Sequence, residues 1–201
     1  MKTWLGETEH AMRSTINLVW AEHAAVAEAS DKVARLEAAT GHGYRQSEAF
    51  MEDFDDEGLA TGIHWDTYFG ADKERYHAAE ALDGLKATQQ ARSASRAALA
   101  GTALQIAKQG ISAVHGKLDA SPDGRREAGV VLRELIWHGR NQAMHWEEGK
   151  PHKAVVTCFE TLKVRNVAFA DYTARSLAFE ILGLLGWEDY AAFEADMWLL
   201  A

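Results

Sequence analysis

The sequence predicts an all-α fold, a bundle of four main helices with a short fifth helix at the C-terminus. Only 2 prolines interrupt the 201 residues, and Ala, Leu and Glu, which favour helix, are frequent. Apolar side chains recur three and four residues apart over long stretches, as on one face of a helix. No segment alternates apolar and polar residues for long enough to indicate a strand. The length suits one helical domain over 1–201 with an insertion.

The first two helices follow from their apolar stripes. One is expected over about residues 10–39, ending before Gly41 and Gly43. The next covers about 72–118, where glycines at 84, 101 and 110 can kink or divide it. Its stripe consists of Leu99, Ala103, Ile106, Gly110, Val114 and Leu118.

Residues 41–72 between these helices differ in composition and are predicted to form an insertion. The segment holds five glycines, an acidic run and several aromatic side chains, and one short helix is expected near 45–54. Its aromatic residues are expected to pack onto the bundle, and a partner or substrate surface is the alternative. They are Phe50, Phe54, Trp65, Tyr68 and Phe69.

Two further long helices and a short one complete the predicted bundle. Ser121-Pro122-Asp123 is typical of a helix start, and an apolar stripe continues to about residue 148. Gly149-Lys150-Pro151 ends that helix, and Pro151 is expected to open another whose stripe reaches Leu184. A short closing helix is predicted over 187–200.

Charge and composition narrow the classes of function. The net charge of −9 disfavours duplex DNA binding, which depends on phosphate contacts, but leaves room for a local single-strand site. No 18-residue apolar run indicates a membrane span, and the N-terminal residues do not resemble a signal peptide. Cys158 is the only cysteine, so no intramolecular disulfide or cysteine zinc site forms, and its place on an apolar stripe predicts a core position. A cytoplasmic protein that contacts no membrane is expected.

The stretch from Trp137 to Trp146 carries the clearest chemistry. It contains Arg140, then Asn141, and His145 five positions after the arginine. An imidazole can exchange protons with the 2′-hydroxyl or the 5′-oxygen of RNA, and a guanidinium can stabilise the charge that develops on the phosphate. Asn141 can orient the phosphate or the arginine by hydrogen bonding. These residue types suit RNA cleavage by the 2′-hydroxyl without a metal or other cofactor.

This pattern resembles the Arg-polar-x(3–5)-His signature of the HEPN superfamily, whose members are all-α domains with the motif on a late helix. The detailed likeness covers residues 133–162. The resemblance implies a homodimer with a composite site, a metal-independent endoribonuclease for single-stranded RNA, and a toxin or antiphage role with an antitoxin or defence partner. It assigns Arg140 and His145 as catalytic, with Asn141 supporting them. In a branch paired with a nucleotidyltransferase antitoxin, Tyr stands two positions after the histidine; here Glu147 does.

Helix geometry gives a separate reason to expect a dimer. Residues five apart on an α-helix differ by about 140° in direction, so Arg140 and His145 of one chain do not project to a common point. Two copies of the helix across a twofold axis could supply both groups to one cleft. His138 shares a face with His145 and could line that cleft or pack. Lys150 and Lys153 are expected to contact the RNA backbone, or to form a solvated basic face.

Two alternatives from other classes accompany this hypothesis. The motif could be structural, in a non-catalytic helical dimer that binds a protein partner or a nucleotide. A carboxylate-bridged di-metal bundle is the third alternative, because Glu7 and His10, and Glu74 and His77, have the Glu-x-x-His spacing of such sites. The further carboxylates would come from Glu22, Glu28 or Glu48.

Overall fold

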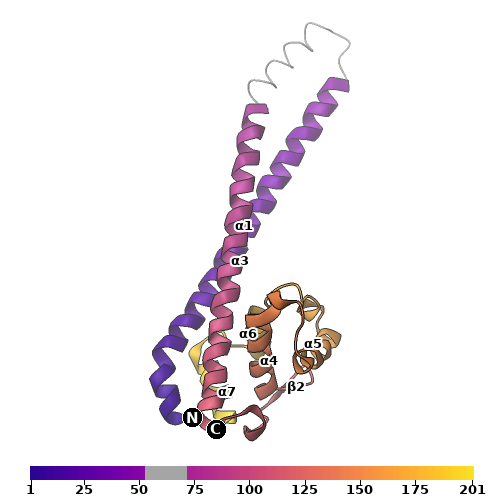
Figure 1. Cartoon of the computed structure of the whole chain (residues 1–201). Helices are drawn as coiled ribbons and strands as arrows, with labels where there is room; N and C mark the ends of the chain where they lie inside the picture. Colours follow the sequence, from indigo (N-terminus) through magenta and orange to yellow (C-terminus); the bar gives the residue numbers. More distant parts are fainter. Residues whose placement is uncertain (53–71) are drawn as a thin grey trace. The chain divides into compact units, whose positions relative to one another are not determined.

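The computed structural model describes the backbone of residues 1–52 and 72–201, and the side chains of 1–35, 77 and 80–201. The all-α prediction is confirmed in these residues (Figure 1). The α-helices are α1 (Lys2–Glu52), α3 (Asp72–His115), α4 (Leu132–His145), α5 (Lys153–Arg165), α6 (Ala178–Leu185) and α7 (Tyr190–Leu199). Short 3₁₀ turns cover Leu118–Ala120, Trp146–Glu148 and Val167–Phe169. No described helix is long and apolar enough to cross a membrane.

The chain forms two compact units, one from residues 1–23 and 94–201 and one from 24–93. The described residues of the second unit belong to α1 and α3, and Gln89 Nε2 donates a hydrogen bond of 2.7 Å to Ser30 Oγ there. The prediction that the first helix ends before Gly41 is wrong, since α1 continues to Glu52. Each glycine inside a helix costs only about 1 kcal/mol, which is too little to end it. Most of the predicted insertion, including Trp65, lies outside the described residues.

The second predicted helix is confirmed as α3, and the glycines do not divide it. Two of them instead allow close packing inside the first unit. A Cβ on Gly110 would lie 2.7 Å from the Trp4 ring, and one on Gly101 would lie 3.2 Å from Met144 Cε. Glycine at these positions lets α1 and α4 approach the surface of α3.

The prediction that a helix begins at Ser121 is wrong, since α4 begins only at Leu132. Residues 126–127 and 130–131 form an antiparallel pair of very short strands, β1 (Arg126–Glu127) and β2 (Val130–Val131), which also corrects the expectation of no strand. Gly124, Ala128 and Gly129 have φ of 69°, 48° and 91°. These left-handed conformations are incompatible with a continuous helix.

The single helix predicted from Pro151 to Leu184 is in fact α5 and α6, separated by residues 166–177, which include a 3₁₀ turn. Asn166 ends α5 in an extended conformation, and its side chain accepts a hydrogen bond of 2.9 Å from the Ala168 amide. Such local bonding of asparagine to the backbone competes with helix. The apolar stripe predicted for one helix is therefore shared by two helices and the turn between them. The predicted closing helix is confirmed as α7.

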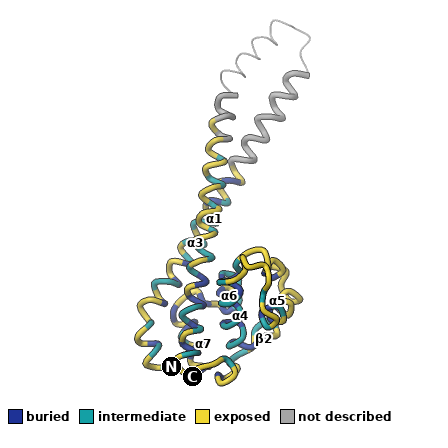
Figure 2. Tube along the Cα trace, in the orientation of Figure 1, coloured by how far each residue is buried: buried dark blue, intermediate teal, exposed yellow. Residues whose placement is uncertain are grey.

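Helix α4 lies in the centre of the first unit, where the buried positions concentrate (Figure 2). Its apolar side chains Leu132, Leu135 and Ile136 are fully buried. A Cβ on Gly139 would lie 3.2 Å from Ile181 Cγ1 of α6 and 3.4 Å from Leu104 Cδ1 of α3. This glycine packs α4 closely between α3 and α6, which fixes the helix that carries the Arg-His motif. Cys158 is buried, as predicted.

Candidate functional site

The candidate site lies where α4 ends and α5 begins. His145 is the last residue of α4, and a 3₁₀ turn over Trp146–Glu148 follows it. Gly149 ends this turn with φ of 67°, a conformation that glycine adopts without strain. The chain then reaches His152, which caps the N-terminus of α5. This turn and the short segment after it thus connect the end of α4 to the start of α5.

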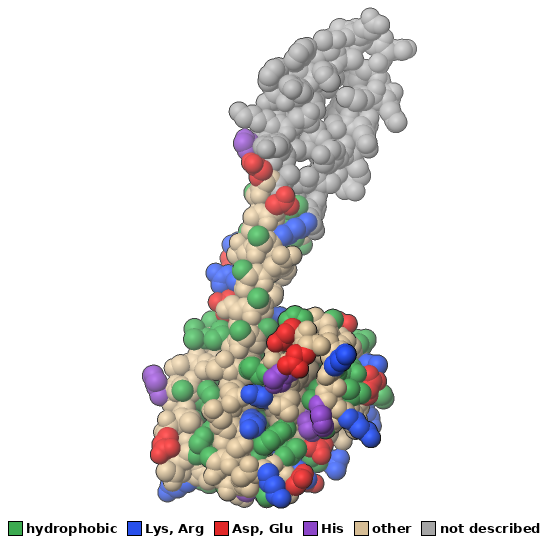
Figure 3. Space-filling model, viewed as in Figure 1, with side chains coloured by type: hydrophobic (Ala, Val, Ile, Leu, Met, Phe, Trp, Pro, Cys, Tyr) green, Lys and Arg blue, Asp and Glu red, His purple; other side chains and the backbone are tan. Residues whose placement is uncertain are grey.

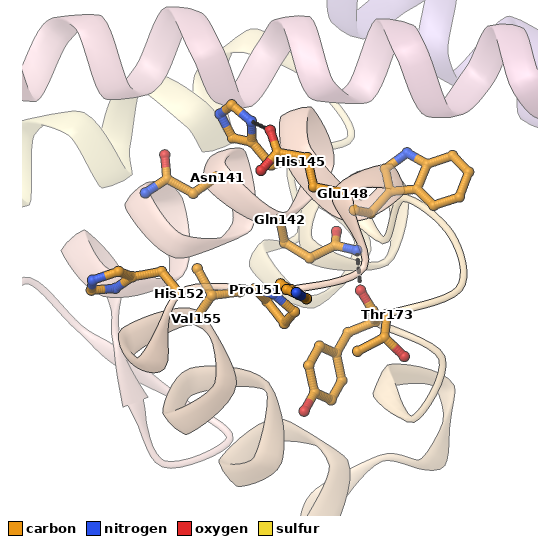
Figure 4. A pocket seen from close by; sticks show the side chains of 11 residues that line it. Asn141, Gln142, His145, Glu148, Pro151, His152, Val155 and Thr173 are labelled. Atoms are coloured by element: carbon orange, nitrogen blue, oxygen red, sulfur yellow. Dashed lines mark hydrogen bonds and ion pairs between the residues drawn. The ribbon is translucent and has the colours of Figure 1, made fainter.

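A cavity of about 450 Å³ occupies this junction (Figure 4). That volume lies within the range of small-ligand sites. Three residues predicted from the sequence line it, namely Asn141, His145 and Lys150. The other lining residues are Gln142, Trp146, Glu148, Pro151, His152, Val155, Tyr172 and Thr173. The structure therefore brings part of the predicted set into one hollow and adds a second imidazole to it.

Asn141 and His145 are four residues apart on α4, so they lie on the same face of the helix. Figure 4 shows both side chains with His152 at a separate place on the wall. His145 is well exposed, with 53% of its side-chain surface accessible. A solvent-accessible imidazole beside an amide can meet a ligand that enters the cavity.

Arg140 does not line the cavity. Its Nε donates a hydrogen bond to Oε1 of Gln105 on α3, and its Nη1 donates to Oδ1 of Asn141 at 3.2 Å. The guanidinium is therefore one hydrogen bond away from the cavity wall, and it joins α3 to α4. In one chain Arg140 and His145 thus have different partners, Gln105 and Asn141 for the guanidinium and Glu148 for the imidazole.

The ring of His145 is held by Glu148. His145 Nδ1 lies 2.7 Å from Glu148 Oε1, and Figure 4 shows this contact as a dashed line. A carboxylate only accepts hydrogen bonds, so Nδ1 carries the hydrogen. This leaves the lone pair on Nε2, the nitrogen that is free to accept a proton.

Gln142 of α4 also lines the cavity and is almost fully buried. Its Nε2 donates to the carbonyl oxygens of Tyr172 and Arg175, both at 2.7 Å, and its Oε1 accepts from the Leu177 amide at 2.9 Å. These bonds attach the segment before α6 to α4. A polar residue inside the apolar period of a helix is the sequence signal that could have revealed this role.

The remaining predicted residues lie outside the cavity lining. His138 is half-buried, and burial lowers the pKa of its imidazole, an effect that Glu134 opposes. Its Nδ1 has no hydrogen-bond partner among the described residues. Lys153 is exposed in the first turn of α5. Trp137 is partly buried and has Lys108 Nζ 4.4 Å from its ring centroid, which is a packing role.

The face of the first unit that is turned to the viewer in Figure 3 mixes cationic, acidic and histidine side chains, with no continuous basic track. The di-metal alternative gains no support from the described residues, where no group of three or more His, Cys, Asp or Glu side chains could hold a metal ion. Glu48 and Glu74 have side chains outside the described set.

Comparisons with known proteins do not indicate a family for the chain, so the functional assignment depends on the site. No protein-family model matches the chain, and neither the curated proteins nor the solved structures that were searched contain a match.

Proposed function

We propose that the protein is a metal-independent endoribonuclease that cuts single-stranded RNA by attack of the 2′-hydroxyl. The observation that carries the proposal is the cavity at the end of α4, which has Asn141 and the accessible His145 on its wall and the Arg140 guanidinium bonded to Asn141. The resemblance of Arg140-Asn141-x-x-x-His145 to the HEPN signature agrees with this chemistry.

In the proposed reaction Nε2 of His145 accepts the proton of the 2′-hydroxyl, and O2′ bonds to phosphorus. The bond from phosphorus to O5′ breaks, and the leaving oxygen takes a proton from water. The products are a 2′,3′-cyclic phosphate and a 5′-hydroxyl end. In each chain Asn141 orients its own Arg140, and the guanidinium supplies positive charge to the phosphate oxygens in the transition state.

The proposed active form is a homodimer. Arg140 lies outside the cavity that His145 lines, so a second chain that brings its own Arg140 would complete the site. An equimolar mixture of Arg140→Ala and His145→Ala is expected to recover activity that neither variant has alone. Light scattering on the wild type checks the dimer independently. A monomer that cleaves RNA would contradict the composite site.

The direct test uses a labelled single-stranded RNA in excess chelator. Wild type is expected to cleave it, while Arg140→Ala and His145→Ala lose at least about 100-fold in rate. Arg126→Ala and His10→Ala serve as matched controls, because both of these side chains are exposed and lie outside the cavity lining. Equal cleavage by wild type and by His145→Ala would contradict the proposal.

A toxin or antiphage role, with an antitoxin or defence protein as partner, is a further part of the proposal that rests on the resemblance. Expression in a bacterial host is expected to arrest growth for the wild type and not for His145→Ala. Equal growth of both strains at matched expression would contradict this role.

A second candidate function is a non-catalytic helical module in which the motif is structural. The hydrogen bond from Arg140 to Gln105 favours it, because it joins α3 and α4. In that case the wild type cleaves no RNA, and the effect of Arg140→Ala is confined to the stability of the fold.

A further inference from the structure

The cavity contains two imidazoles of the same chain, and the sequence motif accounts for only one of them. His145 comes from the end of α4, and His152 comes from the residue that precedes α5. Both side chains are exposed to solvent. Their hydrogen bonds differ in a way that fixes where each ring carries its hydrogen.

In His145 the hydrogen is on Nδ1, since that atom faces the carboxylate of Glu148 at 2.7 Å. In His152 the opposite holds. Its Nδ1 accepts a hydrogen bond of 3.3 Å from the Ala154 amide and so carries a lone pair. The hydrogen of the neutral His152 ring is then on Nε2, the atom that is not used by the cap. Protonation of Nδ1 would remove the acceptor that caps α5.

The rest of the wall matches a nucleotide. The exposed indole of Trp146 and the ring of Pro151 offer apolar surface, while Lys150 and Asn141 supply a cation and an amide. A volume of about 450 Å³ exceeds what one phosphate group needs and suits a phosphate with its sugar or base. In the view of Figure 4 the two imidazoles lie at separate places, with Asn141 between them.

From this arrangement we infer that the cavity binds a nucleotide unit of single-stranded RNA between two imidazoles of opposite tautomer. Nε2 of His145 is the acceptor that faces the 2′-hydroxyl. Nε2–H of His152 is the donor that binds an oxygen of the neighbouring phosphate. This inference rests on the proposed function for the role of His145. His152 is a binding residue, so its loss acts on affinity and not on the chemical step.

The tautomers are tested by ¹⁵N NMR of the full chain labelled at histidine, with His145→Ala and His152→Ala used to assign the two rings. We expect Nδ1–H in His145 and Nε2–H in His152. Glu148→Ala should move His145 toward the Nε2–H form, whereas Glu147→Ala, which removes a neighbouring exposed carboxylate, should not. The same tautomer in both rings, or no response to Glu148→Ala, would overturn the inference.

The binding role is tested with His152→Asn. Asparagine keeps an acceptor for the Ala154 amide, so α5 stays capped while the Nε2–H donor is lost. We expect KM for single-stranded RNA to rise about tenfold with kcat within twofold, because one hydrogen bond to a charged group is lost. His145→Ala should show the reverse, with kcat reduced and affinity for an uncleavable 2′-O-methyl oligoribonucleotide retained.

The outcomes separate this inference from the proposed function. Cleavage by wild type that His152→Asn leaves unchanged in KM would overturn the inference and leave the nuclease assignment intact. Absent cleavage, with the opposite tautomers observed and the 2′-O-methyl oligoribonucleotide bound more weakly by His152→Asn, would overturn the nuclease and support the nucleotide cavity. Equal binding of that oligoribonucleotide by wild type and His152→Asn would overturn the inference in either case.

Discussion

Two polar clusters of the first unit are built in opposite ways. Asp196 on α7 has a side chain only 6% exposed and accepts hydrogen bonds from Arg125 Nε at 2.6 Å, from Arg125 Nη2 at 2.8 Å and from Trp187 Nε1 at 2.8 Å. His145 and Glu148 are 53% and 61% exposed, and they are joined through Nδ1 of the imidazole. In the first cluster both oxygens of a buried carboxylate are hydrogen-bonded, whereas both members of the second pair are open to solvent.

This difference indicates that the Asp196 cluster stabilises the fold, whereas the His145–Glu148 pair serves the proposed chemistry. Arg125 also donates to the Leu185 carbonyl at 2.6 Å, so the buried cluster joins the segment before α4 to α6 and α7. Removing one partner of a buried ion pair is costly, whereas an exposed pair contributes little to stability. Substitutions of buried residues should therefore mainly reduce stability, and substitutions of exposed residues in the site should mainly reduce function.

Asp196→Ala is expected to have the largest effect on stability. It leaves the Trp187 indole N–H unpaired and removes the main partner of Arg125, so the free energy of unfolding should fall by about 3–5 kcal/mol. Urea unfolding followed by circular dichroism measures it. Glu188→Ala, which removes an exposed carboxylate nearby, should change it by less than about 0.5 kcal/mol. Equal values for the two variants would contradict the structural role.

Gln142→Leu should come next. The substitution keeps the side-chain volume but leaves the Leu177 amide and the carbonyls of Tyr172 and Arg175 without their partner. A loss of about 2–3 kcal/mol is expected, and urea unfolding again measures it. Gln109→Leu on the exposed side of α3 is the control, and a similar loss there would show that the burial of Gln142 is not the cause.

Arg140→Ala tests the tie between α3 and α4. It removes one charged hydrogen bond to Gln105, so a decrease of about 1–2 kcal/mol in the free energy of unfolding is expected. Gln105→Ala should give a similar decrease, and the double variant should cost less than the sum of the two. Strict additivity would show that the two side chains do not interact.

His138 gives the first unit a pH dependence of known sign. Burial lowers the pKa of this imidazole, so on acidification the unfolded chain binds a proton before the folded chain does. The free energy of unfolding should therefore decrease as the pH falls below about 6.5. His138→Gln should show less of this decrease between pH 7.5 and pH 5.5 in urea titrations, whereas His10→Gln should keep it. An unchanged decrease in His138→Gln would exclude this imidazole as its source.

Glu148→Ala should have the smallest effect on stability, at most about 0.5 kcal/mol, because both members of the pair are exposed. The same variant should reduce RNA cleavage through the orientation of His145. Thermal unfolding and a cleavage assay on one preparation compare the two effects. A large loss of stability would contradict this prediction, because it would give the exposed pair the structural role assigned to the Asp196 cluster.

The apolar periodicity predicted α3 well, since the observed helix Asp72–His115 is close to the expected range 72–118. The periodicity gave wrong helix boundaries where one polar side chain or a left-handed backbone conformation ends a helix. Asn166 divides a stripe that looks continuous, and the residues around Gly129 replace the predicted start of α4 by a hairpin. Spacing alone cannot show these effects, because they depend on local hydrogen bonds and on contacts with distant residues.

For the candidate site, the sequence motif singled out Asn141 and His145, and the structure has both side chains on the wall of one cavity. The cavity itself needs contacts between segments far apart in the chain, such as the bonds of Gln142 to residues 172–177. No motif in the sequence singles out His152. Its tautomer follows from the cap of α5, which is a property of the folded backbone.

The chemistry of the ends of cleaved RNA tests the central claim most directly. Wild-type protein in excess chelator should leave a 2′,3′-cyclic phosphate or 3′-phosphate on one fragment and a 5′-hydroxyl on the other, and replacing the ribose at the cut by deoxyribose should abolish the cut. Mass spectrometry of the fragments identifies the ends. Fragments with a 3′-hydroxyl and a 5′-phosphate would contradict attack by the 2′-hydroxyl and the role given to His145.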